Sequence, residues 1–269
     1  MKVHIAHANG IPGAVYQPLI EQIDGDAFAI PRVGHRPEYP ITKEWTALVR
    51  ELEAYVESRA GGEKVFLVGH SLGAILSFQL AHHRPDLVSG LLMLDPPLIY
   101  SRGVWLARFL RLIGKFEDIT PARLSKRRKR RWPDFEAARS YFESKSFYTQ
   151  FDPRTFAAWI EHGIQPIGNE IGLSFDVDAE VAIFNTTPLY LNRFKGPLQV
   201  PAWLVYATGD IVCTKTHAEP FARHYHLNIE PTEGKHMFPL VNVDGTAAII
   251  NRCLGELNAN RGSAGQNGE

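Results

Sequence analysis

The 269 residues are enough for one large α/β domain, or for a domain with an insertion, and leave ample length for a buried core. Lys plus Arg and Asp plus Glu number 29 each, so no net field favours nucleic acid as the main partner. Two cysteines, Cys213 and Cys253, are too few for a disulfide framework, and the first residues lack a signal-peptide core. No apolar run approaches the length of a transmembrane helix. The sequence therefore predicts a cytoplasmic protein without a membrane span.

Strand-like and helix-like segments alternate along the first hundred residues. Short apolar segments predict strands at 2–8, 26–30, 65–68 and 90–94. Apolar residues recur at helical spacing from Trp45 to Val56, and Gly61 follows as a stop signal. This alternation indicates a mostly parallel sheet with helices on both faces.

The alternation stops at Pro97 and resumes at Pro201, which leaves a long insertion. Helix-like pieces lie within it at 104–114, 134–144 and 152–162. Because ligands of open α/β sheets bind at the carboxyl ends of the strands, residues 98–200 are expected to form a helical cap over those ends. Its aromatic residues either line an apolar pocket or pack the cap itself: Trp105, Phe109, Tyr141, Phe142, Phe147, Phe156 and Trp159.

A second run of alternating elements follows the insertion. It predicts a strand at 202–206, a helix at 217–225, an edge strand at 227–230 and a closing helix up to Leu257. The expected organisation is a core of residues 1–97 and 201–257, with about six strands, interrupted by the cap. The polar tail 258–269 is expected to be disordered.

The pentapeptide Gly69-His70-Ser71-Leu72-Gly73 lies between the strand at 65–68 and a helix-like segment. A serine hydroxyl becomes a useful nucleophile only when it is held rigidly beside a base, as at a sharp strand-to-helix corner. Gly69 would let the backbone turn, and Gly73 would let the helix pass close to a neighbouring strand. The Leu72 amide, at the start of that helix, would point at a developing oxyanion.

A base and an orienting acid follow Ser71 in the order acid, then histidine. Asp210 comes directly after a predicted strand, and His236 lies in the loop after the next one. Asp95, at an earlier strand end, is the rival acid, although Asp95-Pro96-Pro97 also reads as the hinge into the cap. Asn9 follows the first strand and is the candidate for the second oxyanion amide, unless Asn9-Gly10 is merely a tight turn.

Other polar residues have simpler interpretations. His70 and His7 are predicted to be packing or structural histidines. The basic run Lys126–Arg131 either forms a solvated helix face or attracts an anionic lipid surface or an acyl carrier such as coenzyme A. Neither a metal-binding histidine pair on a helix nor a nucleotide-binding glycine motif occurs, so no metal and no cofactor are expected.

The chain resembles the α/β-hydrolase superfamily over nearly its whole length. The matching pieces are His7-Ala8-Asn9-Gly10, Gly69-His70-Ser71-Leu72-Gly73, Ala207-Thr208-Gly209-Asp210 and Gly234-Lys235-His236. The resemblance implies Ser71 as nucleophile, His236 as general base and acid, Asp210 as its carboxylate, and the Leu72 and Asn9 amides as the oxyanion hole. The chain departs from the family in lacking two N-terminal strands and in having Ala8 and Ala207 where glycine is frequent.

The cap is similar to that of small hydrolases described as esterases or lipases at 126–133, Phe151-Asp152-Pro153 and Glu161-His162-Gly163. We therefore expect a serine hydrolase that cleaves a carboxylic ester of a fairly apolar small molecule through an acyl-enzyme. Two alternatives stay open. The same residues could cleave a thioester or a carbon–carbon bond, or the fold could serve as a ligand-binding receptor with little turnover.

Overall fold

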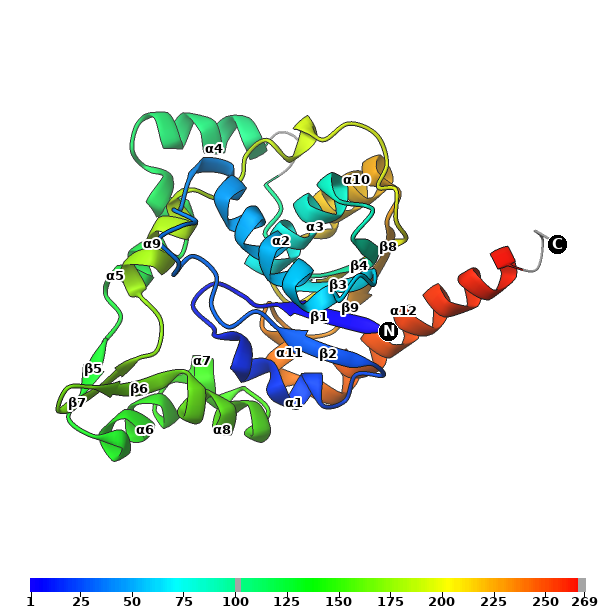
Figure 1. Cartoon of the computed structure of the whole chain (residues 1–269). Helices are drawn as coiled ribbons and strands as arrows, with labels where there is room; N and C mark the ends of the chain where they lie inside the picture. The colour runs from blue at the N-terminus through cyan, green and yellow to red at the C-terminus, as the bar shows by residue number, and fades with distance from the viewer. Residues whose placement is uncertain (100–102, 266–269) are drawn as a thin grey trace.

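The computed structural model describes the backbone of residues 1–99 and 103–265, and the side chains up to residue 259. Its centre is a six-stranded sheet in the order β2-β1-β3-β4-β8-β9 (Figure 1). Neighbouring strands pair in parallel throughout, as the alternating pattern predicts. The strands are β1 (Lys2–Ala6), β2 (Asp26–Ala29), β3 (Val65–His70), β4 (Val88–Leu94), β8 (Ala202–Ala207) and β9 (Asn228–Thr232). The expected mostly parallel sheet of about six strands is therefore confirmed.

Helices cover both faces of this sheet, which buries β3 and β4 completely. On one face lie α2 (Thr46–Ala60), α3 (Leu72–His83) and α10 (Lys215–Tyr225). On the other lie α1 (Gln17–Ile20), α11 (Phe238–Val241) and α12 (Val243–Gly265). Strands buried on both faces read as continuous apolar runs, which is why 65–68 and 90–94 stand out in the sequence.

The register of the central strands aligns the ends from which the site is built. His70 at the end of β3 pairs with Leu94 at the end of β4, and Leu94 pairs with Val205 in β8. The next residues, Ser71 and Asp95, therefore leave adjacent strands at the same edge of the sheet. Strand β4 separates β3 from β8, so Asp95 follows a strand nearer to Ser71 than the strand before Asp210.

The insertion contains the expected helices and also a small sheet that the sequence does not predict. Strands β5, β7 and β6 form an antiparallel sheet in that order beside the helices (Figure 1). The elements are α4 (Gly103–Leu112), α5 (Ala122–Lys126), β5 (Arg131–Trp132), α6 (Phe135–Glu143), α7 (Ser146–Thr149), α8 (Pro153–His162), β6 (Ile164–Ile167), β7 (Glu170–Leu173) and α9 (Val177–Asn185). Single 3₁₀ turns are η1 (Gly13–Tyr16), η2 (Lys43–Trp45), η3 (Phe116–Ile119) and η4 (Leu191–Arg193).

The aromatic residues of the insertion differ in burial, and Tyr141 and Phe156 are partly buried. Phe142 and Trp159 are fully buried and pack edge to face, with ring centroids 5.4 Å apart, so they hold the insertion together. Trp105, Phe109 and Phe147 are exposed. Packing therefore accounts for only part of the aromatic content.

Helix α12 continues to Gly265, and an apolar stripe on its first turns packs against the sheet. The disordered tail at 258–269 stays a prediction. Residues 266–269 lie outside the described part of the chain. The division into a core and an inserted cap stays a prediction.

Candidate active site

Ser71 lies at the strained corner between β3 and α3. Its φ of 55° and ψ of −116° belong to a region that non-glycine residues rarely adopt. A Cβ on Gly69 would lie 2.3 Å from the Gly73 carbonyl oxygen, and a Cβ on Gly73 would lie 2.0 Å from the Ala6 carbonyl oxygen. Both glycines are therefore required for α3 to start where it does, as the sequence predicts.

Ser71, His236 and Asp95 form a continuous hydrogen-bonded chain. His236 Nε2 is 2.9 Å from Ser71 Oγ, and His236 Nδ1 is 2.6 Å from Asp95 Oδ2. With the Nδ1 proton donated to the carboxylate, the lone pair of Nε2 faces the serine hydroxyl. This arrangement can remove a proton from Ser71.

The structure places Asp95, not Asp210, against the imidazole. Asp95 is fully buried and its other oxygen, Oδ1, accepts the Ala207 amide at 2.8 Å. Asp210 instead accepts the backbone amide of His236 at 3.1 Å and that of Ile211 at 2.6 Å. The expectation that Asp210 orients the imidazole is corrected, because both carboxylates reach the loop of His236 but only Asp95 meets its ring, whereas Asp210 bonds the backbone.

A buried pair that the sequence analysis did not assign to the site lies behind it. The His70 ring, treated there as packing, is within hydrogen-bond distance of the Tyr16 hydroxyl through Nδ1 (2.6 Å) and of the His236 carbonyl oxygen through Nε2 (2.9 Å). Burial holds the pKa of His70 well below its ordinary value, and burial raises the pKa of Tyr16, so both stay neutral. In one consistent arrangement, Tyr16 donates to His70, which donates to His236. No sequence motif marks Tyr16.

The loop after β1 is fastened to the serine corner. The Gly73 amide donates to the His7 carbonyl oxygen at 3.2 Å, and the Ala8 amide donates to the Tyr16 hydroxyl at 3.1 Å. His7 accepts the Val33 amide at Nε2 and lies 2.8 Å from the Ala8 carbonyl oxygen through Nδ1, which is the structural role expected of it. The loop is thus held from three sides.

The two candidate oxyanion amides flank this junction. Among the described residues, neither the Leu72 amide nor the Asn9 amide donates a hydrogen bond. Each is next to a residue whose own amide is bonded, since Gly73 follows Leu72 and Ala8 precedes Asn9. The Asn9 side chain donates from Nδ2 to the Glu180 carbonyl oxygen at 2.9 Å. Helix α9 of the insertion therefore braces the loop that carries the Asn9 amide.

A sequence model described as the alpha/beta hydrolase family matches residues 5–249. The chain belongs to the alpha/beta hydrolase family. No curated protein matches the sequence of this hydrolase.

Solved structures similar to this hydrolase share its fold at low sequence identity. A peroxisomal α/β-hydrolase from Saccharomyces cerevisiae has a TM-score of 0.73 at 14% identity, with 96% of this chain and 78% of that chain covered. An E-2-(acetamidomethylene)succinate hydrolase has a TM-score of 0.73 at 20% identity, covering 94% and 90%. An esterase from Mycobacterium tuberculosis has a TM-score of 0.71 at 19% identity, covering 95% and 84%. At these identities the likeness establishes the fold.

The basic run of this hydrolase is mostly engaged in ion pairs inside the insertion. Lys126 lies 2.5 Å from Glu117, Arg128 lies 3.1 Å from the buried Glu180, and Arg130 lies 2.7 Å from Asp178. Arg131 faces Glu170 at 3.4 Å. These contacts tie α5 to η3, the segment between α5 and β5 to α9, and β5 to β7, so most of the run is committed to neighbouring acids.

In the described part of the chain, no group of three or more His, Cys, Asp or Glu side chains is placed to hold a metal ion. No described helix combines the length and apolar character that crossing a bilayer requires.

Proposed function

We propose that this hydrolase cleaves a carboxylic ester of a fairly apolar small molecule through an acyl-enzyme on Ser71. The observation that carries the proposal is the unbroken chain from Ser71 Oγ to His236 to Asp95, at 2.9 Å and 2.6 Å. A nucleophile, a base and an orienting carboxylate in this geometry are what acyl transfer requires.

In the first half of the reaction, Ser71 Oγ attacks the ester carbonyl carbon while His236 Nε2 takes the hydroxyl proton. Asp95 holds the imidazole by its Nδ1 proton and stabilises the imidazolium that forms. The Leu72 and Asn9 amides donate to the oxyanion. When the tetrahedral intermediate collapses, the carbon–oxygen bond to the alcohol breaks and His236 gives its proton to the leaving oxygen.

In the second half, water takes the place of the alcohol. His236 removes a proton from the water, whose oxygen attacks the acyl carbon, and the bond from that carbon to Ser71 Oγ then breaks. His236 returns the proton to Ser71, and the carboxylic acid leaves. No redox equivalent or additional group is consumed.

The choice of an ester rests on the similar structures, which include esterases from Mycobacterium tuberculosis and from a marine microorganism.

The test is hydrolysis of p-nitrophenyl esters from acetate to palmitate by the wild type, Ser71→Ala and Ser77→Ala. Ser77 is buried on α3 and its hydroxyl has no hydrogen-bond partner among the described residues, so Ser77→Ala is a matched control. We expect a chain-length optimum, its loss in Ser71→Ala and its retention in Ser77→Ala. Equal rates in all three proteins, or cleavage of acyl thioesters alone, would overturn the ester assignment.

A further inference from the structure

Helix α4 turns its apolar side chains outward. They recur at positions 105, 106, 109, 112 and 113, which form one stripe of a helix with 3.6 residues per turn. Their exposed fractions are 70%, 59%, 56%, 84% and 46%: Trp105, Leu106, Phe109, Leu112 and Ile113. A contiguous apolar patch of this kind is uncommon on a monomer and marks an interaction surface.

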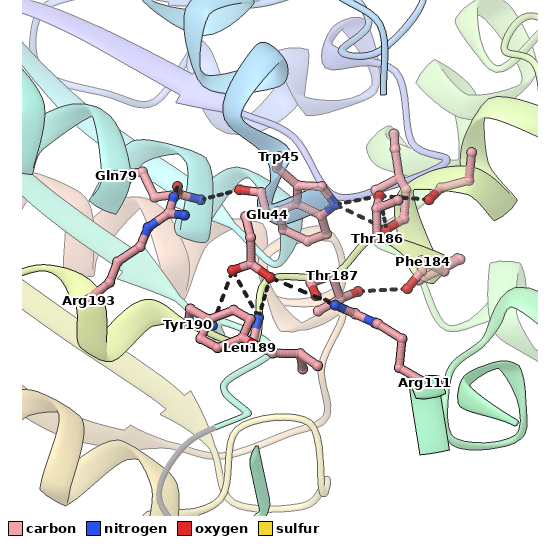
Figure 2. A network of polar contacts seen from close by, with 12 residues as sticks. Glu44, Trp45, Gln79, Arg111, Phe184, Thr186, Thr187, Leu189, Tyr190 and Arg193 are labelled. Carbon is pink, nitrogen blue, oxygen red and sulfur yellow. Dashed lines mark hydrogen bonds and ion pairs between the residues drawn. The ribbon is translucent and has the colours of Figure 1, made fainter. Parts of the chain in front are cut away.

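The opposite side of α4 is held to the protein by polar contacts. Arg111 donates from Nη2 to the Thr187 carbonyl oxygen at 2.6 Å and lies 3.7 Å from Glu44, as Figure 2 shows. Glu44 in turn accepts the amides of Leu189 and Tyr190. The inward face of α4 thus buries Ala107 against Phe116 and Leu189 and presents Arg111 to Glu44, while the outward face is apolar as well. An ordinary surface helix has a polar outward face.

The charge along α4 and the turn that follows it has a single sign. No acidic residue occurs between Gly103 and Phe116, whereas Arg108, Arg111 and Lys115 do. Arg108 lies beside the stripe, with its guanidinium 5.0 Å from the Trp105 ring centroid. Neither Arg108 nor Lys115 has an acidic partner among the ion pairs of the described residues.

The excess of basic over acidic residues continues from α4 to Arg131. Residues 103–131 contain ten Lys or Arg against two acids, Glu117 and Asp118, although the whole chain is neutral. The remainder of the chain is therefore acidic. An apolar stripe rimmed by unpaired cations matches the interface of an anionic lipid layer, where the apolar side chains enter the acyl boundary and the cations meet the headgroups.

We propose that α4 docks this hydrolase on anionic lipid surfaces, with the stripe of Trp105, Leu106, Phe109, Leu112 and Ile113 inserted and Arg108 and Lys115 at headgroup level. A second copy fits the same face less well, because two-fold pairing would bring two cationic segments together. Most side chains of the basic run Lys126–Arg131 already pair with acidic residues of the insertion. We therefore assign the lipid contact to α4 and not to that run.

The test is cosedimentation with vesicles of phosphatidylcholine, alone or with 30% phosphatidylglycerol, a composition chosen to set a surface potential of roughly tens of millivolts. Ser71→Ala serves as the parent protein, so that no lipid ester is cleaved and the result is independent of the proposed function. The variants are Leu106→Glu/Phe109→Glu and Arg108→Gln/Lys115→Gln. Ile229→Glu is the matched control, because Ile229 is an exposed apolar residue on β9, outside the insertion.

We expect the parent to bind the anionic vesicles, the Leu106/Phe109 variant to lose roughly tenfold or more of its partition coefficient, and Ile229→Glu to bind as the parent does. The Arg108/Lys115 variant should lose the preference for anionic lipid, and raised salt should do the same. Absence of binding, or equal binding by all variants, would overturn the proposal. So would sedimentation velocity that shows a dimer dissociated by the Leu106/Phe109 change.

Discussion

His70 Nε2 and the His236 carbonyl oxygen lie 2.9 Å apart, so the residue before the serine supports the backbone of the histidine that faces it. The rings are also close, with centroids 5.1 Å apart. Through Nδ1, His70 reaches Tyr16, whose hydroxyl accepts the Ala8 amide. One buried chain of hydrogen bonds therefore joins the oxyanion loop to the loop of the base.

Tyr16→Phe tests this connection. The change leaves the Ala8 amide and His70 Nδ1 without their partner, which should lower the free energy of unfolding by about 1–3 kcal/mol. It should also lower kcat by roughly tenfold with little change in KM, because the groups that act in the transition state lose their alignment. Steady-state kinetics and urea unfolding measure the two effects. Tyr55→Phe, which removes a hydroxyl bonded to the Ala29 carbonyl, is the control and should leave kcat unchanged.

Asp95→Asn and Asp210→Asn separate the two candidate acids. An asparagine amide in place of the Asp95 carboxylate would not hold the imidazole in the required tautomer, so kcat should fall by about 10³–10⁴. Asp210 bonds only backbone amides, and an asparagine oxygen can still accept them, so that variant should lose less than about tenfold. Parallel measurements of kcat/KM decide between them. A severe loss in Asp210→Asn with a mild loss in Asp95→Asn would contradict the geometric assignment.

Local patterns predict the serine corner, while the choice of acid depends on how separate loops meet in space. Gly69, Ser71 and Gly73 lie within five positions of one another, and the apolar run before them identifies the strand. Both Asp95 and Asp210 follow strands and reach the loop of His236, and nothing in the sequence indicates which carboxylate meets its ring. Tyr16 could not be found at all, because its partner His70 is 54 positions away and only the tertiary fold brings them together.

Gly73→Ala tests the close approach of α3 to β1. A Cβ at this position would lie 2.0 Å from the Ala6 carbonyl oxygen. Because that oxygen belongs to the backbone of β1, either the strand or the helix would have to move. We expect a loss of about 3 kcal/mol or more in the free energy of unfolding, at the upper end for overpacking. Gly255→Ala is the matched control, because the corresponding Cβ on α12 meets nothing within 4 Å beyond its own chain neighbours and helix backbone. Similar denaturation midpoints for both variants would argue against this packing.

Acid should destabilise the fold through two buried histidines. Burial lowers the pKa of His4 from 6.5 to about 3 and that of His7 from 6.5 to about 4. The unfolded chain therefore binds more protons than the folded one below pH 6.5, so the stability contributed by the neutral rings is present above 6.5 and lost as pH falls. Each neutral ring should lower the free energy of unfolding by about 1.4 kcal/mol for every pH unit below 6.5. This loss should continue down to pH 4 for His7 and to pH 3 for His4.

His4→Leu isolates one of these rings. Both nitrogens of His4 lack hydrogen-bond partners among the described residues, and the ring packs against Phe28 and Tyr55, so an apolar side chain suits the site. Urea unfolding between pH 7 and pH 4.5 should show a shallower loss of stability in His4→Leu, by about 2–3 kcal/mol at the acid end. His224→Leu is the control: the exposed His224 should change the slope little. Identical slopes for the wild type and His4→Leu would mean that His4 is protonated in the folded state, or reaches water, below pH 6.5.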